Sequence, residues 1–186
     1  GSFSAPSNIA YLGANDPYVV FPEANSYDSP DGNTRLSGGY GTFVFQPQIE
    51  STGALFVLSM GNLSDTAVVI TNNDNTQTRT EITDTRLIID SSEGTLPLDA
   101  SLPVNILRMG EVNIYGTSDS SGILEIRTGG DTDMGGIYAI GNTINMNGAS
   151  QIIQSGSNSH SLQGNMVIKP YSNVFMHNQS TQKLFI

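Results

Sequence analysis

Residues 111–126 read EVNIYGTSDSSGILEI, and the pattern in this stretch decides the fold. Apolar and polar residues alternate from Val112 to Tyr115, Gly116 ends the run, and a polar turn leads to a second alternating run at residues 123–127. Alternation with a period of two is typical of a strand that buries one face. The stretch therefore predicts short strands that end at glycine and are joined by polar turns.

The same pattern continues to the C-terminus. Further short runs, separated by recurring glycines, lie at residues 137–140, 144–147, 151–153, 166–169 and 174–177. Strands this short bury little alone, so repeats must stack to form a core. Two arrangements do this: a one-chain β-helix, or an intertwined β-prism in which three copies share an axis. Residues 111–186 hold few turns of a one-chain solenoid and no evident capping helix, which favours the trimer because closure removes open sheet edges.

The N-terminal part predicts a compact β domain over residues 1–103. Its candidate strands lie at 18–21, 42–45, 54–58, 67–70, 78–83 and 86–89. The most hydrophobic run, at 54–58, is expected to be a central strand buried on both faces. Strands about 10–15 residues apart indicate a jelly-roll-like sandwich. Pro97 and Pro103 interrupt any ladder, so we place a domain boundary there and assign 104–186 to a glycine-punctuated β shaft segment.

Composition excludes several classes of function. The net charge of −10 disfavours nucleic acid and anionic membrane surfaces as partners. The chain has no cysteine, which removes disulfides, thiolate metal sites and cysteine nucleophiles. No apolar stretch approaches the length of a membrane span. A cysteine-free, Ser/Thr/Asn/Gly-rich chain favours a bacterial or viral protein that is stabilised by oligomerisation.

Three segments carry a resemblance to a known group of proteins. Residues 112–116 (VNIYG), 144–148 (INMNG) and 162–168 (LQGNMVI) resemble the shafts of bacteriophage tail fibres and tailspikes, and of trimeric bacterial fibre adhesins. The resemblance covers roughly the last 75 residues. It implies a homotrimer, an extracellular position on a virion tail or cell surface, and attachment to a host or prey cell-surface receptor, either a glycan or a protein. In many such fibres the receptor-binding head follows the shaft, whereas here the more globular part comes first.

Carbohydrate binding needs an aromatic platform with polar partners, and without tryptophan that platform must be tyrosine. Tyr27 and Tyr40 flank a polar loop that contains Asp28, Asp31 and Arg35, so these five residues form the candidate ligand-binding patch. The alternative is that the tyrosines are half-buried residues at strand edges.

Calcium is a possible ligand of two loops rich in oxygen-bearing side chains. One contains Asp28, Asp31 and Asn33, and the other contains residues 73–75 (NDN). Turn formation is the favoured explanation of both loops, since neither matches the twelve-residue helix–loop–helix calcium pattern.

No catalytic constellation emerges, and we expect no enzyme. His160 and His177 lie in polar stretches without a nucleophile motif. A polysaccharide depolymerase would use paired carboxylates, for which Asp131, Asp133 and Glu125 are the candidates. The sequence therefore favours a trimeric fibre or adhesin module that binds a receptor, with a purely structural virion or appendage component and a depolymerase fragment as alternatives.

Overall fold

The computed structural model describes part of the chain, and every structural statement below refers to that part. The described residues are 10–22, 26–29, 31–59, 66–72, 75–90, 110–127, 137–140, 142–155, 159–162, 164–179 and 184–185.

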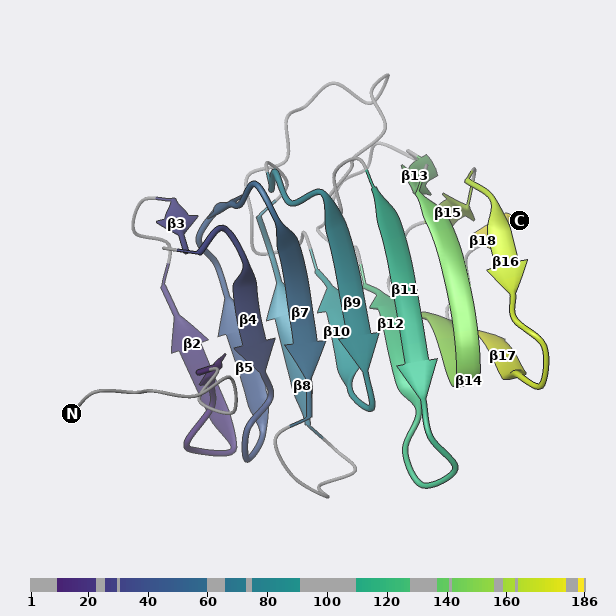
Figure 1. The fold of residues 1–186 in the computed structure, drawn as a ribbon, viewed down its shortest axis with the longest axis horizontal. Helices are drawn as coiled ribbons and strands as arrows, with labels where there is room; N and C mark the ends of the chain where they lie inside the picture. Colours follow the sequence, from purple (N-terminus) through teal and green to yellow (C-terminus); the bar gives the residue numbers. More distant parts are fainter. Residues whose placement is uncertain are drawn as a thin grey trace.

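Two sheets, which we name sheet A and sheet B, pack face to face. Sheet A lies in front and sheet B behind in Figure 1. Sheet A contains β1 (Leu12–Gly13), β4 (Thr34–Ser37), β7 (Ala54–Leu58), β9 (Arg79–Thr83), β11 (Glu111–Gly116), the first half of β14 (Thr143–Gln154) and β16 (Met166–Ile168). Sheet B contains β2 (Tyr18–Phe21), β5 (Thr42–Phe45), β8 (Ala67–Ile70), β10 (Arg86–Ile89), β12 (Gly122–Ile126), the second half of β14 and β17 (Asn173–Asn178).

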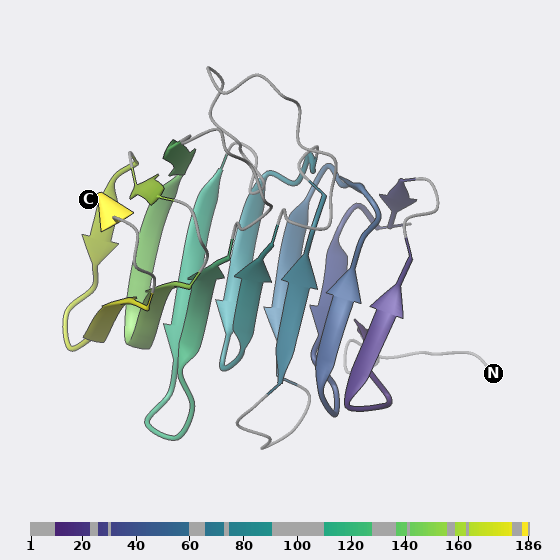
Figure 2. The ribbon, with the colours of Figure 1, turned by 180° about the vertical axis from the view of Figure 1, so that it is seen from behind.

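Short strands form a third side. They are β3 (Tyr27–Asp28) paired with β6 (Ile49–Glu50), and β13 (Ile137–Ile140), β15 (Ser159–Leu162) and β18 (Leu184–Phe185). Figure 2, seen from behind, brings sheet B to the front.

Every pairing between described strands is parallel. Strands that follow one another in sequence lie in different sheets, and each pairs with its counterpart one circuit later. The chain therefore winds as a solenoid of stacked coils, each of which adds one strand to sheet A and one to sheet B. Strands β1 and β2 lie at one end of the stack, and β16 and β17 lie at the other (Figure 1).

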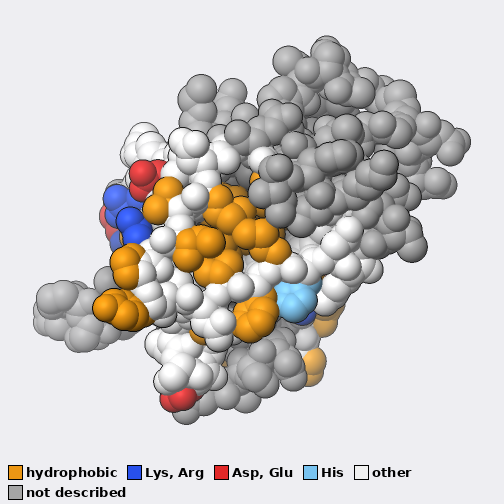
Figure 3. Space-filling view, turned by 90° about the vertical axis from the view of Figure 1, so that its right-hand side faces the viewer, with side chains coloured by type: hydrophobic (Ala, Val, Ile, Leu, Met, Phe, Trp, Pro, Cys, Tyr) orange, Lys and Arg blue, Asp and Glu red, His pale blue; other side chains and the backbone are white. Residues whose placement is uncertain are grey.

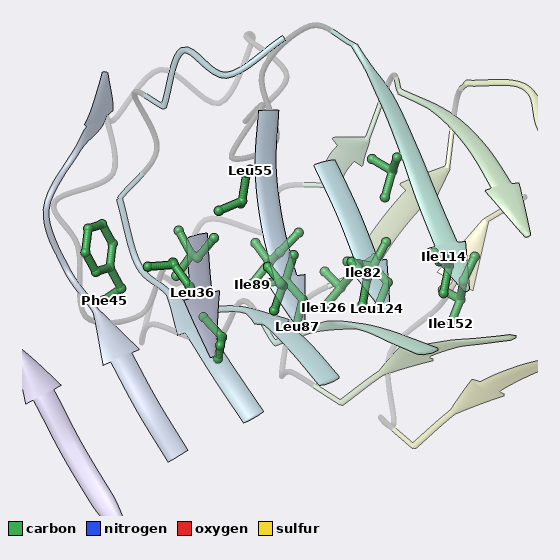
Figure 4. Close-up of a cluster of buried hydrophobic side chains, with 14 of the residues drawn as sticks. Leu36, Phe45, Leu55, Ile82, Leu87, Ile89, Ile114, Leu124, Ile126 and Ile152 are labelled. Carbon is green, nitrogen blue, oxygen red and sulfur yellow. The ribbon is translucent and has the colours of Figure 1, made fainter. Parts of the chain in front are cut away.

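The core fills the space between the two sheets. Strand alternation sends every second side chain inward, and the parallel register stacks these side chains into columns. One column of sheet A runs Leu12, Leu36, Val57, Ile82, Ile114, Met146 and Ile168. One column of sheet B runs Val19, Phe43, Val68, Leu87, Leu124, Ile152 and Met176. Figure 4 shows such side chains from both sheets meeting in one continuous cluster.

The turn from sheet A to sheet B requires glycine in the long strand β14. Gly148 has a φ of 61°, a left-handed conformation that glycine adopts without steric cost. A Cβ atom at this position would lie 2.0 Å from the carbonyl oxygen of Gly116 in the coil below. Glycine therefore lets two coils approach closely at the corner while the strand changes sheet.

The expected all-β class is confirmed, because the described residues contain strands and no helix. The finer arrangement differs from the expected jelly-roll-like sandwich, whose strands would be antiparallel. Alternating runs look alike in parallel and antiparallel ladders, so this periodicity could not distinguish them. The expected boundary near residue 103 lies outside the described residues, and both sheets continue on either side of it through the pairs β9–β11 and β10–β12.

Candidate functional site

The outer face of sheet A carries a continuous column of polar and aromatic side chains. We name this column the face ladder; in register it consists of Arg35, Phe56, Glu81, Asn113 and Asn145. The residues next to them on the same strands point into the core, so alternation places the ladder on the opposite, outer surface.

One end of the face ladder combines a carboxylate, two guanidinium groups and an aromatic ring. Asp31 and Arg35 form an ion pair of 2.7 Å. The guanidinium carbons of Arg35 and Arg79 lie 5.8 and 6.0 Å from the centre of the Phe56 ring. Cation–π contacts of this length hold both arginines over the ring.

The ionised form of Asp31 is strongly favoured over the protonated form. The side chain of Arg35 and the backbone N–H of Asn33 hold the pKa of the Asp31 carboxyl well below its usual range. In return, Asp31 raises the pKa of the Arg35 guanidinium, with smaller contributions from Tyr11 and Tyr27. The pair therefore offers fixed hydrogen-bonding groups at any ordinary pH.

The middle of the ladder places Tyr115 beside Glu81. The Arg79 Nε donates to Glu81 at 3.1 Å. Tyr115 is 39% exposed, and its pKa is raised by burial, then by the charge of Glu81 and a hydrogen bond to that carboxylate. Tyr115 thus presents a neutral phenol on the surface, held in place by a charged neighbour.

The other end of the ladder is a chain of amide hydrogen bonds. Asn113 Nδ2 donates to Glu81 at 3.1 Å, and Asn145 Nδ2 donates to Asn113 at 2.9 Å. Both asparagines are nearly buried, so these bonds mainly fix the register of the coils. Sheet A can therefore present Phe56, Arg79 and Tyr115 to a ligand on a rigid support.

The structure brings together some of the residues expected in the ligand patch and separates others. Asp31 and Arg35 are paired, and Tyr27 lies near them, but its ring packs edge-on against Phe45 at 5.6 Å and joins the core. Tyr40 is 74% exposed in the turn after β4, at the opposite end of that strand from Asp31. The side chain of Asp28 lies outside the described residues.

Sequence reasoning missed Phe56, Arg79, Glu81 and Tyr115 as a group. Phe56 was expected in a strand buried on both faces, yet it lies half-buried under two arginines on the outer face. The alternation at residues 78–83 indicated a solvent-facing or edge strand, and β9 (Arg79–Thr83) forms there. What the sequence did not reveal was the parallel register, which alone brings residues 56, 81 and 113 side by side.

The outer face of sheet B is different. Its central column is Val44, Val69, Ile88, Glu125 and Ile153, all nearly or fully buried. Glu125 is fully buried and forms ion pairs with Arg86 and, at 3.0 Å, with Arg127. Ser155 donates a further hydrogen bond to the same carboxylate. Glu125 was a candidate catalytic carboxylate, and these partners hold it in a network of ion pairs and a hydrogen bond. Asp131 and Asp133, the other two candidates, lie outside the described residues.

The loops considered for calcium are occupied by internal contacts where they are described. Asp31 accepts hydrogen bonds from Ser29 and from the backbone of Asn33, each at 3.0 Å. Asn75 is buried; its side chain accepts from the Ile49 N–H and donates to the Asn72 carbonyl, each at 2.8 Å. Residues 73–74 lie outside the described part, within which no cluster of three metal-ligating acidic or histidine side chains occurs.

Among the described side chains, no histidine belongs to a cluster of potential metal ligands. His177 is exposed on β17 and its ring stacks on Phe175 at 5.9 Å. The side chain of His160 lies outside the described residues.

Comparison of the chain with protein-family models, with curated proteins and with solved structures found no match. In the described part of the chain, no helix is long and apolar enough to cross a membrane.

Proposed function

We propose that this protein is an extracellular fibre or adhesin module that attaches to a glycan on a host or prey cell surface. In this proposal the ligand lies along the outer face of sheet A, and the module has no catalytic role of its own.

One observation carries the proposal: the juxtaposition of Phe56, Arg79, Glu81 and Tyr115 on one rigid, solvent-facing surface. Sugar rings present an apolar face and a rim of hydroxyl groups. An aromatic ring beside charged and phenolic hydrogen-bonding groups matches both features. The accessible side chains of Arg35, Phe56, Arg79 and Tyr115 come from four successive coils, a length that suits a chain of several sugar units better than a single one.

The local charge indicates a neutral ligand. Arg35 is balanced by Asp31 and Arg79 by Glu81, so no unpaired positive charge in the described ladder is left for an anionic sugar. Each ion pair can still donate and accept hydrogen bonds through its remaining atoms.

The homotrimer remains part of the proposal as a prediction. The trimer was expected because short strands bury little apolar surface alone. In the described part of the chain, however, the solenoid already forms a core cluster of 20 buried residues within one chain. Its support now rests on the resemblance of residues 111–186 to fibre shafts. Sedimentation equilibrium of the purified chain measures it, and a monomer at all concentrations would remove it.

Binding to a glycan array, followed by titration of the best ligand, tests the function. Phe56→Ala and Arg79→Ala are expected to weaken binding roughly tenfold each, equivalent to about 1.4 kcal/mol. Tyr40→Ala is the matched control, because this exposed tyrosine lies outside the face ladder and its loss should leave binding unchanged. Binding that survives the first two substitutions and is lost with Tyr40→Ala would place the site elsewhere.

A structural virion or appendage component is the second candidate, and the exposed apolar residues at the ends of the stack favour it. Apolar core columns that end at exposed residues, such as Ile168, suit a spacer that stacks on further copies. Absence of any hit on the array, together with no binding to whole cells, would support this candidate over the first.

A further inference from the structure

In the described part of the chain, core columns end at exposed apolar residues at both ends of the stack. Within the stack, Met146 and Ile114 are fully buried, yet Ile168 at the C-terminal end of the same column is 54% exposed. In sheet B the column that buries Leu124 ends at Met176, which is 37% exposed. Figure 3 shows hydrophobic side chains gathered on this end of the molecule.

The N-terminal end of the stack shows the same pattern. Phe21 is 38% exposed although it continues a column of buried core residues through Phe45 and Ile70. Tyr18 and Val20 on the same strand are 59% and 42% exposed. Among the described strands, β1 and β2 at this end and β16 and β17 at the other each pair with a strand on one side only.

We infer that the C-terminal end of one copy stacks on the N-terminal end of a second copy, head to tail, so that the two sheets continue from chain to chain. The contact is formed by β16 and β17 of one copy and by β1 and β2 of the next. It is independent of the glycan face and of any ligand.

The two ends match because they are the two ends of the same columns. Register-preserving stacking places Ile168 over Leu12 and Met176 over Val19, and both are apolar pairs in core columns. In an outer column of sheet B it places Phe175 over Tyr18, an aromatic pair.

Other contacts between the two stacked ends involve polar or charged residues. Asn178 of one copy would stack on Phe21 of the next. This is the one pair of a polar and an apolar residue among the core columns of β2 and β17. Charge at the corner between the sheets is complementary: exposed Lys169 follows β16, and exposed Asp16 lies in the equivalent turn between β1 and β2. Stacking brings these opposite charges to the same corner.

Strand direction favours this arrangement over a symmetric one. A C-terminal end that met a second C-terminal end would place β17 antiparallel to its copy and break the column register. Head-to-tail contacts use two different surfaces and do not close on themselves, so they produce an open rod. The expected product is a filament that lengthens with concentration.

Blocking variants test the inference on the whole chain by sedimentation velocity over a wide range of concentrations. Ile168→Asp places a charge in the C-terminal contact. Val20→Lys does so in the N-terminal contact, where the register places residue 20 next to His177 of the other copy. Each variant alone should keep one constant mass at all concentrations, whereas the mass of the wild-type assembly should increase with concentration. An equimolar mixture should form one-to-one pairs and nothing longer, because each variant keeps the end that the other has lost.

Ser118→Asp is the control, because this residue lies in an exposed turn in the middle of the stack; it should assemble like the wild type. Circular dichroism and thermal unfolding check that each variant is folded, and Phe175→Asp with Tyr18→Asp provides a second blocking pair at exposed positions. A wild type of constant mass at all concentrations would overturn the inference. So would a Val20→Lys variant that still associates alone while Ile168→Asp does not, since that result indicates contact between two C-terminal ends.

Discussion

At the scale of single residues, the face ladder ties the chemistry of one side chain to the charge of its neighbour. Tyr115 has a raised pKa, first because it is partly buried and then because the Glu81 carboxylate lies beside it. A raised pKa means that the phenol of the folded protein stays neutral where that of the unfolded chain ionises.

Two consequences follow for Tyr115. The stability that this residue contributes is complete below pH 10 and is lost as the pH rises through its folded pKa. Glu81→Gln removes the charge, so we expect the pKa of Tyr115 to fall toward its ordinary value. Titration of the tyrosine ring-carbon shifts by NMR measures this, and Asp119→Asn in an exposed turn is the control. An unchanged Tyr115 pKa in Glu81→Gln would show that burial alone sets it.

Glu125 provides a second prediction at this scale. Glu125→Gln leaves Arg86 without its carboxylate and Arg127 with only Asp90, at 3.9 Å, and we expect the free energy of unfolding to fall by about 1–3 kcal/mol. The loss is limited because both arginine side chains are partly exposed, at 36% and 43%. Denaturant unfolding measures it. If the variant kept full stability but abolished release of reducing ends from a polysaccharide, Glu125 would be a catalytic group instead.

At the scale of elements, much of the strand pattern could be predicted and the pairing could not. The expected strands at 18–21, 42–45, 54–58, 67–70 and 86–89 match β2, β5, β7, β8 and β10. These runs are visible because apolar and β-branched residues stand between turn signals. The strand at Thr34–Ser37 was missed, since a short polar run such as TRLS carries no periodicity.

The binding face was harder to predict than the strands. Asp31 and Arg35 are close in sequence, so their pairing followed from a local loop. Phe56 and Arg79 are 23 residues apart and meet only because β7 and β9 pair in parallel. No local pattern encodes that register, which depends on the lengths of the turns between coils.

The corner glycine yields a prediction for one element. Gly148→Ala adds a Cβ against the Gly116 carbonyl and forces a left-handed φ on an alanine. We expect a loss of at least about 1 kcal/mol in unfolding free energy, because both effects act in the same direction. Chemical denaturation checks it, with Ala149→Gly at the next position as the comparison. Equal stability of Gly148→Ala and the wild type would mean that the corner relaxes to accept a side chain.

At the scale of the whole molecule, one chain supplies both sheets, the core between them and the face ladder on the surface of sheet A. The face ladder depends on this arrangement, because its five members come from five different coils. An intertwined trimer would instead build each column from three chains. The two arrangements differ in which chain provides the neighbour of a given strand.

A designed disulfide separates the two arrangements most directly. Thr83 on β9 and Tyr115 on β11 are register partners on either side of residues 91–109, and the wild-type chain contains no cysteine. The measurement is the mass of the oxidised Thr83→Cys/Tyr115→Cys double variant on a non-reducing denaturing gel. The single-chain solenoid predicts a reducible crosslink within one chain, at monomer mass, whereas crosslinked dimers and trimers would contradict it.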